Sequence, residues 1–188
     1  MAQPIEQTEL QIGTVSEISA AWLREFASAL HTSNAAAVAR MFLPDGWLRD
    51  SLAFTWNNRS LHGRAKITSY LGQTLSFSPI SNVAFDKDPY FVPKCHAPQG
   101  GTIEFGFRYE TPIAWGRGHA RLMRTAIGRW EASTVGMIIT DMKGHEEPAD
   151  GIDWEVQAKG RSWDQLQADL RTKTETNPTV LIGGSCFS

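Results

Sequence analysis

The chain contains few cysteines: its 188 residues include only two, Cys95 and Cys186, far apart in the sequence. Neither belongs to a Cys-x-x-Cys pair, so a disulfide framework is not expected, and a reducing, cytoplasmic setting is the simplest interpretation. Two short groups contain metal-ligating residue types, residues 95–96 and 145–147, but neither has a second pair at ligand spacing. We therefore expect no metal site.

Long apolar runs and an excess of one charge are also missing. The formal net charge is −2, so no basic face is predicted, and nucleic acid is not an expected partner. No apolar run approaches the length of a membrane-spanning helix, so a membrane is not an expected partner either. The N-terminal residues lack the basic start and apolar stretch of a secretory signal, and we expect residues 1–15 to form an arm.

Tryptophan, by contrast, is plentiful, with seven in the chain. Because aromatic side chains bury large areas, this number favours a large core or an aromatic-lined cavity. The length allows one domain with its own core but not a second full domain.

The first third of the chain has the apolar spacing of helices. Residues 16–31 carry apolar side chains four residues apart, which predicts an amphipathic helix with Ser16 as its N-cap. A second, short helix is expected over residues 35–42 and a third over residues 63–75. Residues 46–63 are rich in aromatic and charged side chains without a clear period, and we expect an irregular segment there.

After the third predicted helix the hydrophobic period changes to two, which is typical of strands. A Gly-containing turn near residue 128 predicts an antiparallel hairpin between the last two strands. Helices followed by long strands predict an α+β domain, with the helices packed on one face of a curved, mainly antiparallel sheet that encloses a pocket. The expected strands are residues 82–86, 102–113, 118–127 and 129–142.

The composition changes near the C-terminus. From residue 144 the chain is polar and rich in Gly and Pro, which indicates a linker. Ser162 with Gln165 three residues later is a capping-box pattern and predicts the start of a last helix. The final segment, NPTVLIGGSCFS (residues 177–188), has the pattern of a strand that opens a dinucleotide-binding domain.

Several blocks of this sequence resemble fungal flavin-containing monooxygenase-like proteins. The segment MFLPDGWLRDSLAFTWNNRSLHGRAKITSYL (residues 41–71) is similar to their N-terminal region. Residues 110–112, 116–122 and 143–148 then match further blocks in the same order. The chain therefore resembles the SnoaL-like, or nuclear-transport-factor-2-like, domain of these proteins, which implies a cone-shaped fold over residues 16–143.

In the same family the following domain binds flavin and nicotinamide. Val180–Ile182 matches the opening strand of that domain and Gly184 its first glycine, but Cys186 takes the place of the second. The motif requires glycine because backbone N–H groups must approach a pyrophosphate at a helix N-terminus. We expect no cofactor, and we interpret residues 144–188 as a linker, a helix and a vestigial strand of a missing dinucleotide-binding domain.

The resemblance also implies a class of activity. We expect a cofactor-independent enzyme of fungal secondary metabolism that binds an apolar, polyketide- or terpenoid-like intermediate. It would promote isomerisation or cyclisation, either acid/base-assisted or pericyclic, such as an intramolecular Diels–Alder reaction. The alternatives are a dehydratase of the same fold and a non-catalytic remnant that binds a small molecule or dimerises. By analogy with the family, a homodimer formed through the sheet is expected.

Asp50 is the first catalytic candidate. It lies between Trp47 and Phe54 in an apolar stretch, and apolar surroundings disfavour the charged form of a carboxyl, which suits it to general acid/base catalysis. The alternative is an ion pair with a nearby cation. The possible partners are Arg49, Arg59 and Arg64.

His119 and Arg121 are the other catalytic candidates, and they alternate with Met123 on one predicted strand. If their face lines the cavity, a proton carrier beside a fixed cation could polarise a carbonyl or hold an enolate. The opposite register would turn them to water and place Ala120 and Leu122 inside.

Aromatic, apolar and cationic side chains complete the expected substrate site. In a cone fold the core face of the sheet is also the wall of the pocket, so a core role and a binding role are both open. His62 has a further alternative, which is to cap the third helix or hold the loop before it. The substrate-binding candidates are Trp47, Trp56, Arg59, His62, Phe105, Phe107, Tyr109, Met123 and Met137.

Overall fold

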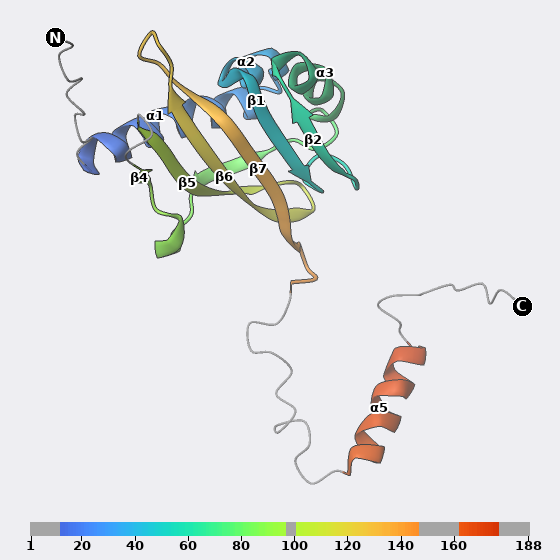
Figure 1. The fold of residues 1–188 in the computed structure, drawn as a ribbon. Coiled ribbons are helices and arrows are strands. Elements are labelled where there is room, and N and C mark those ends of the chain that lie inside the picture. The colour runs from blue at the N-terminus through green and yellow to red at the C-terminus, as the bar shows by residue number, and fades with distance from the viewer. Residues whose placement is uncertain (1–11, 97–100, 147–161, 177–188) are drawn as a thin grey trace, which may run out of the picture. The chain divides into compact units, whose positions relative to one another are not determined.

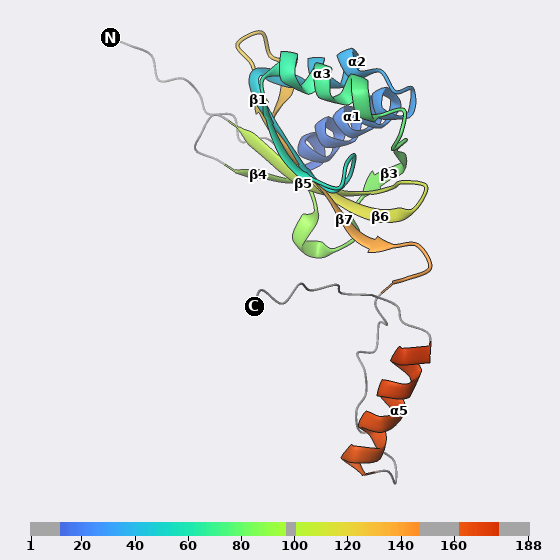
Figure 2. The same cartoon turned by 90° about the vertical axis from the view of Figure 1, so that its right-hand side faces the viewer.

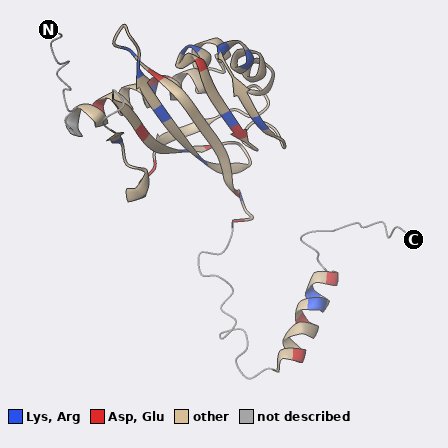
Figure 3. Cartoon of the chain, viewed as in Figure 1, with Lys and Arg blue, Asp and Glu red and all other residues tan. Residues whose placement is uncertain are grey.

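A computed structural model describes residues 12–96, 101–146 and 162–176 of the chain. The chain divides into two compact units, residues 1–146 and 147–188. The first unit combines a sheet with helices, and the second contributes one described helix (Figure 1). Side chains of both charge signs are spread over the strands and helices of the first unit rather than gathered by sign (Figure 3).

The described residues of the first unit include three α-helices: α1 (Ile12–His31), α2 (Ala35–Arg40) and α3 (Arg64–Thr74). All three were predicted, but α1 begins at Ile12, so the expected N-cap Ser16 lies inside the helix. The buried side chain of Val15 extends the apolar stripe of α1 by a turn, which gives the earlier residues a packing reason to be helical.

Seven strands form one mixed, curved sheet in the order β2-β1-β7-β6-β5-β3, and β4 also pairs with β5. Neighbouring strands are antiparallel except for β1 and β7, which are parallel. The helices lie over one face of the sheet, as the α+β prediction required (Figures 1 and 2). The strands are β1 (Phe42–Ser51), β2 (Asn58–His62), β3 (Ser81–Phe85), β4 (Lys94–His96), β5 (Thr102–Glu110), β6 (Ala114–Arg124) and β7 (Trp130–Met142).

The prediction of an irregular segment over residues 46–63 is wrong. These residues include most of β1 and all of β2, which form an antiparallel hairpin at one side of the sheet. Within β1, Leu48 and Asp50 are buried and Trp47 and Arg49 are exposed, so a period of two is present. It escaped detection because the inward set contains a carboxylate and the outward set a tryptophan.

Pro44 and Gly46, which follow the predicted second helix, both lie within β1. The pairing of β1 with β7 is irregular between Phe42 and Trp47, and this irregularity accommodates the proline. A Cβ on Gly46 would lie 2.8 Å from the carbonyl oxygen of Ala132 in β7, so the close approach of the two strands requires glycine there.

Aromatic rings from β5 fill the centre of the inner face. They lie on two glycines of the neighbouring strand: Phe107 over Gly118, and Tyr109 over Gly116. A Cβ on Gly118 would be 2.1 Å from the Phe107 ring, and one on Gly116 would be 2.2 Å from the Tyr109 ring. From the helix side, Phe26 of α1 meets the Phe107 ring edge-on at a centroid distance of 5.9 Å. The middle of the cone is therefore packed with its own side chains.

Two strands share the outer edge of β5. β3 pairs with its C-terminal part and β4 with its N-terminal part. Between them, the N–H of Asp86 donates to the carbonyl of Gly106 (3.1 Å), and a short 3₁₀ helix, η1 (Pro89–Phe91), follows. The Asp86 side chain is fully buried and forms ion pairs with Arg108 (3.0 Å) and Arg117 (2.6 Å).

The second unit contains α5 (Trp163–Thr176). The predicted capping box is confirmed: the Ser162 N–H donates to Gln165 Oε1 (3.0 Å), and the Gln165 N–H donates to Ser162 Oγ (3.3 Å). Most of the predicted linker and the whole predicted vestigial strand lie outside the described residues. Among the described helices, none combines the length and the apolar character needed to span a bilayer.

The packing of Phe107 on Gly118 gives a first prediction. Gly118→Ala should destabilise the protein by roughly 2 kcal/mol, because the new methyl group overlaps the Phe107 ring in a packed core. Gly136→Ala on β7 is the matched control, since its Cβ would have no atom within 4 Å. Urea unfolding should show a large loss for the first variant and none for the second. Equal losses of unfolding free energy in the two variants would show that the packing of the aromatic rings does not depend on glycine at residue 118.

The Asp86 ion pairs predict a pH dependence. Burial by itself raises the pKa of the Asp86 carboxyl, but the Asp88 N–H and the guanidinium groups of Arg108 and Arg117 outweigh it and lower the pKa below its usual 3.8. A lowered pKa in the folded state contributes stability that is present above the unfolded value and is lost as the pH falls through the folded value.

Asp86→Asn should therefore cost roughly 2 kcal/mol of unfolding free energy at neutral pH. The difference from wild type should stay constant down to pH 3.8 and shrink below it. Urea unfolding across this pH range measures the difference. A gap that does not change in acid would contradict the role assigned to the carboxylate.

Candidate functional site

A pocket of about 280 Å³ lies at the end of the first unit where the β1–β2 loop, the residues after α3, the β5–β6 turn and the end of β7 meet. We call it the rim pocket, because the aromatic rings already fill the centre of the inner face. Its lining is mostly apolar and includes Leu52, Phe54, Trp56, Phe77, Ile113 and Met142.

The fully buried Asp50 lies beside the rim pocket. It points inward because it follows Leu48 at a spacing of two on β1. Its Oδ1 accepts hydrogen bonds from the N–H groups of Ala53 (2.7 Å) and Phe54 (3.3 Å), and both of these residues line the pocket. Leu52 has a φ of 71°, so the backbone turns sharply here and directs these N–H groups back to the carboxylate.

Tyr70 connects Asp50 to the pocket wall. Its hydroxyl, which comes from α3, donates to Asp50 Oδ2 at 2.5 Å and lies 3.1 Å from Oγ1 of Thr55, a residue that lines the pocket. Burial, together with the hydrogen bond to Asp50, raises the pKa of Tyr70 to about 12. The phenol is therefore neutral at ordinary pH, and an unbroken line of hydrogen bonds runs from Thr55 through Tyr70 to Asp50.

The direction of this line depends on the proton of Asp50. When Asp50 is ionised, Tyr70 donates to it and Thr55 donates to Tyr70, so the Thr55 oxygen presents a lone pair to the pocket. When Asp50 is protonated, its carboxyl O–H donates to Tyr70, the hydroxyls of Tyr70 and Thr55 both reverse, and Thr55 presents an O–H donor instead. The arrangement can thus accept or deliver one proton at the pocket wall.

A larger hollow of about 420 Å³ lies at the opposite end of the unit, between α1, α2 and the β6–β7 turn. Its ionisable lining residues are Glu25, Arg40, Arg129 and Glu131, and none of them is buried. Because water screens exposed charges, this hollow offers less for acid/base chemistry, and we place the candidate site at the rim pocket.

Comparison with known proteins identifies the fold but not a family. No protein-family model and no curated protein matches the chain. A domain of unknown function with a cystatin-like fold from Nostoc punctiforme is 11% identical, with 87% of this chain and 99% of that one covered at a TM-score of 0.54. A nuclear-transport-factor-2-like protein of unknown function from Pseudomonas putida is 12% identical, with 76% and 98% covered at a TM-score of 0.52.

The first unit has the nuclear-transport-factor-2-like fold. This confirms the predicted fold class. ActVI-ORFA from Streptomyces coelicolor also matches, at 17% identity and a TM-score of 0.49, with 65% of this chain and 95% of that one covered. At these identities the likeness concerns the fold alone, and the expected origin from a flavin monooxygenase stays a prediction.

Asp50 forms none of the ion pairs that the sequence offered as an alternative. Arg49 donates to Ser60 Oγ (2.6 Å), and Arg64 pairs with Glu131 (2.9 Å). Within the described residues, the carboxylate is held by backbone N–H groups and a phenol instead. Asp50 is fully buried, and its catalytic role stays a prediction.

The expected placement of His119, Arg121 and Met123 in the cavity is wrong. These three side chains are exposed on the outer face of the sheet, and Ala120 and Leu122 are buried inside. Strand alternation allowed either register. The aromatic rings of β5 decide it, because they require the glycines of β6 to face inward.

On the outer face, His119 and Arg121 belong to a charged cluster around Glu104. Arg121 Nε donates to Glu104 Oε1 (2.5 Å), while His119 lies 4.0 Å and His96 3.5 Å from Oε2. Burial lowers the pKa of His119, Glu104 partly offsets this, and Arg121 lowers it further. This histidine cannot reach the rim pocket on the other face.

Three other substrate-binding candidates, Trp47, Arg59 and His62, do not line the rim pocket. Trp47 and His62 are cross-strand partners that stack at a centroid distance of 4.4 Å, and both are exposed. The N-cap of α3 is Gly63, without a side-chain hydrogen bond, so His62 does not cap that helix. Arg59 lies opposite Asp50 in the hairpin register but is exposed. Of the substrate-binding candidates predicted from the sequence, only Trp56 lines the rim pocket.

The remaining candidates Phe105, Phe107, Tyr109 and Met137 are buried on the inner face, as expected for core positions. None of them lines the rim pocket. The Tyr109 hydroxyl is buried and has no hydrogen-bond partner among the described residues. Burial raises the pKa of Tyr109, and the charge of Asp50 raises it further.

Sequence reasoning missed Tyr70 and Thr55. Tyr70 was counted only as part of the apolar face of a helix, although a tyrosine on an inward stripe usually needs a partner for its hydroxyl. Thr55 gave no signal, because the β1–β2 hairpin that brings it to α3 was not predicted. Residues 111–113 of the β5–β6 turn also line the pocket, but they are far from residues 52–56 in the sequence and only the fold brings the two segments together.

Within the described ranges, no group of three or more His, Cys, Asp or Glu side chains is arranged to hold a metal ion. Cys95 is a half-buried free thiol on β4, and Cys186 lies outside the described residues. The chemistry that the described site can offer is therefore that of hydroxyl groups and a carboxylate.

The buried Tyr109 and the partly buried Tyr70 give opposite predictions. Tyr109→Phe should stabilise the protein by roughly 1 kcal/mol, because it removes a buried hydroxyl without a partner. Tyr70→Phe should destabilise it by roughly 2 kcal/mol, because Asp50 Oδ2 loses its donor. Urea unfolding of both variants measures the difference. Destabilisation of equal size in both would refute the network described above.

Proposed function

We propose that the chain is a cofactor-independent enzyme that binds a small apolar carbonyl compound in the rim pocket and catalyses its isomerisation or acid/base-assisted ring closure. The observation that carries this proposal is the line Thr55–Tyr70–Asp50, which joins an apolar pocket to a buried carboxylate. An apolar enclosure strengthens hydrogen bonds and disfavours charge, which is the setting general acid/base catalysis requires.

The proton moves along hydroxyl groups. In the forward direction, protonated Asp50 gives its proton to Tyr70, Tyr70 gives its own to Thr55, and Thr55 gives its own to the substrate carbonyl oxygen. Each hydroxyl gains one proton and loses one, so among the protein groups only Asp50 changes charge. The substrate carbonyl takes up the matching positive charge. With a pKa of about 12, the Tyr70 phenol stays neutral before and after the transfers. Loss of an α C–H proton from the substrate to water completes the enol.

The size of the pocket limits the substrate. At about 280 Å³ it lies just below the usual range of roughly 300–1,000 Å³ for ligand sites, so the reacting part of the substrate is small and the rest extends outside. A pericyclic ring closure that depends on enclosing a long chain receives less support, because aromatic side chains fill the centre of the cone. The polyketide- or terpenoid-like substrate and the fungal metabolic context stay predictions from the sequence resemblance.

The filled centre also favours a second candidate, a non-catalytic binding or dimerisation domain. Such a domain has no use for a cavity, and its open sheet face would carry the contacts. The outer face does expose apolar side chains suited to a homodimer, among them Trp47, Trp115, Met123 and Ile138.

Deuterium exchange of an apolar ketone tests the proposal. 2-Tetralone exchanges its α-hydrogens through the enol, and NMR in D₂O follows the exchange. The wild type should accelerate it above the rate in matched buffer. Asp50→Asn, Tyr70→Phe and Thr55→Val should each reduce the protein-dependent rate by at least about tenfold, since each interrupts the line of proton transfer.

The matched control is Tyr90→Phe, which removes an exposed tyrosine hydroxyl of η1 and should keep the wild-type rate. Binding of 2-tetralone without acceleration would favour the non-catalytic candidate. Acceleration that persists in all three site variants would show that the proton does not follow this line.

A further inference from the structure

A further hollow, of about 590 Å³, lies on the outer face of the sheet over the C-terminal part of β5 and the adjoining ends of β6 and β7. Two arginines line it, Arg108 and Arg117, and they stand directly opposite each other in the β5–β6 register. Like charges in this position destabilise a sheet, so the pair needs an explanation.

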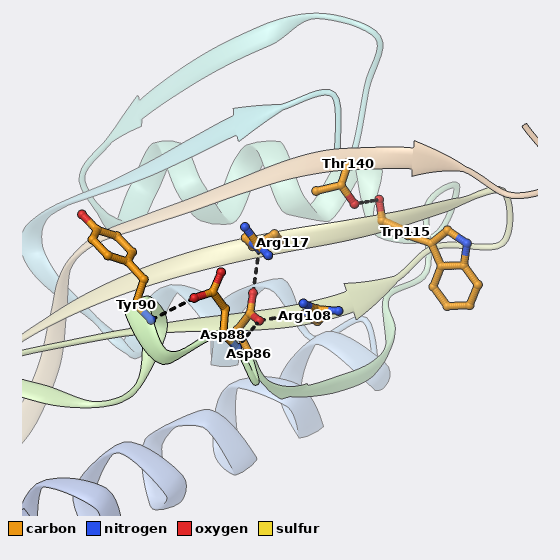
Figure 4. Close-up of polar contacts among 7 residues, drawn as sticks. All are labelled: Asp86, Asp88, Tyr90, Arg108, Trp115, Arg117 and Thr140. Atoms are coloured by element: carbon orange, nitrogen blue, oxygen red, sulfur yellow. Dashed lines mark hydrogen bonds and ion pairs between the residues drawn. The ribbon is translucent and has the colours of Figure 1, made fainter. Parts of the chain in front are cut away.

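Asp86 explains how the fold tolerates the pair. Its carboxylate has no exposed area and lies between the two guanidinium groups, with Arg108 Nε 3.0 Å from Oδ1 and Arg117 Nε 2.6 Å from Oδ2 (Figure 4). The single negative charge of Asp86 therefore forms ion pairs with two positive charges. The cluster of three side chains keeps one positive charge in excess at the hollow.

Both arginines contact Asp86 through Nε, which leaves their terminal Nη groups unused. Among the described residues, neither set of Nη atoms has a hydrogen-bond partner. Side-chain exposures of 58% for Arg108 and 33% for Arg117 show that solvent reaches both groups. Two guanidinium groups thus present free donors side by side, a pattern that recognises the two oxygens of a carboxylate or phosphate.

The Arg117 guanidinium is held in place before any anion binds. Arg117 lies over the ring of Phe91 at 4.6 Å from its centroid, and the Phe91 side chain packs against Gly106, where a Cβ would be only 2.6 Å away. A side chain held by an ion pair on one side and a ring on the other loses little further entropy when it binds an anion.

The remaining lining of the hollow selects among anions. Glu110 borders it, and Lys143 (2.9 Å) and Asn82 (2.9 Å) already engage this carboxylate. Asp141 also borders it. With these acids nearby, one excess positive charge fits a singly charged group better than a phosphate. Trp115 also lines the hollow and is 40% exposed, and its ring already carries Lys143 Nζ at 4.6 Å from the centroid.

We propose that this hollow binds the carboxylate of a small aromatic monocarboxylic acid, with Arg108 and Arg117 holding the carboxylate and Trp115 contacting the ring. The site is separate from the rim pocket on the opposite face, and it does not depend on the reaction proposed there.

Calorimetric titration with benzoate tests this site on the full chain. Benzoate should bind the wild type, and benzamide, its neutral counterpart, should not. Arg108→Gln should weaken benzoate binding by at least about tenfold, because it removes a charge-assisted donor. Arg49→Gln is the matched control, because it removes another exposed arginine of the same face that lies on β1, and it should bind as the wild type does.

Arg117→Lys provides a second variant, which keeps the charge and loses the planar fork, and it should also weaken binding. Circular dichroism checks that each variant is folded. Equal affinities in wild type, Arg108→Gln and Arg117→Lys would overturn the proposal, as would equal binding of benzamide. Inorganic phosphate that displaces benzoate at lower concentration than acetate does would overturn the choice of a monocarboxylate.

Discussion

The packing of two aromatic rings on two glycines is the constraint on which the rest of the first unit depends. Phe107 and Tyr109 of β5 occupy the space that side chains at Gly118 and Gly116 of β6 would take. This contact decides which face of β6 is inside, and it fills the centre of the cone. The pocket lies at the rim, beside the β1–β2 loop, where the buried carboxylate Asp50 also lies.

Two buried carboxylates show two ways of holding a charge away from water. Asp50 lies among apolar groups and is held by two backbone N–H groups and the hydroxyl of Tyr70, with no cation paired to it among the described residues. Asp86 lies between the guanidinium groups of Arg108 and Arg117. The first arrangement leaves a proton to move, since its partners are hydroxyls and amides. The second leaves positive charge in excess, and it therefore suits anion binding rather than proton transfer.

These differences assign separate chemistry to the two faces of the sheet. The inner face supports a small apolar pocket with hydroxyl groups beside it. The outer face combines exposed aromatic rings with paired charges, among them those of Asp86, Arg108 and Arg117 (Figure 4). His119 and Arg121 belong to the outer face, where Glu104 engages both. An acid/base mechanism at the rim therefore depends on Asp50 and its hydroxyl partners, without help from a histidine or an arginine of β6.

Local spacing was enough to predict the three helices of the first unit, the turn near residue 128 and the capping box of Ser162 with Gln165, because each depends on neighbours within a few residues. It was also enough to single out Asp50. The sequence by itself could not decide which face of β6 points inward, nor that residues 46–63 form a hairpin, nor that Tyr70 meets Asp50. Alternation is symmetric between the two faces of a strand, and only the rings of β5 resting on glycine, a contact between strands, break that symmetry.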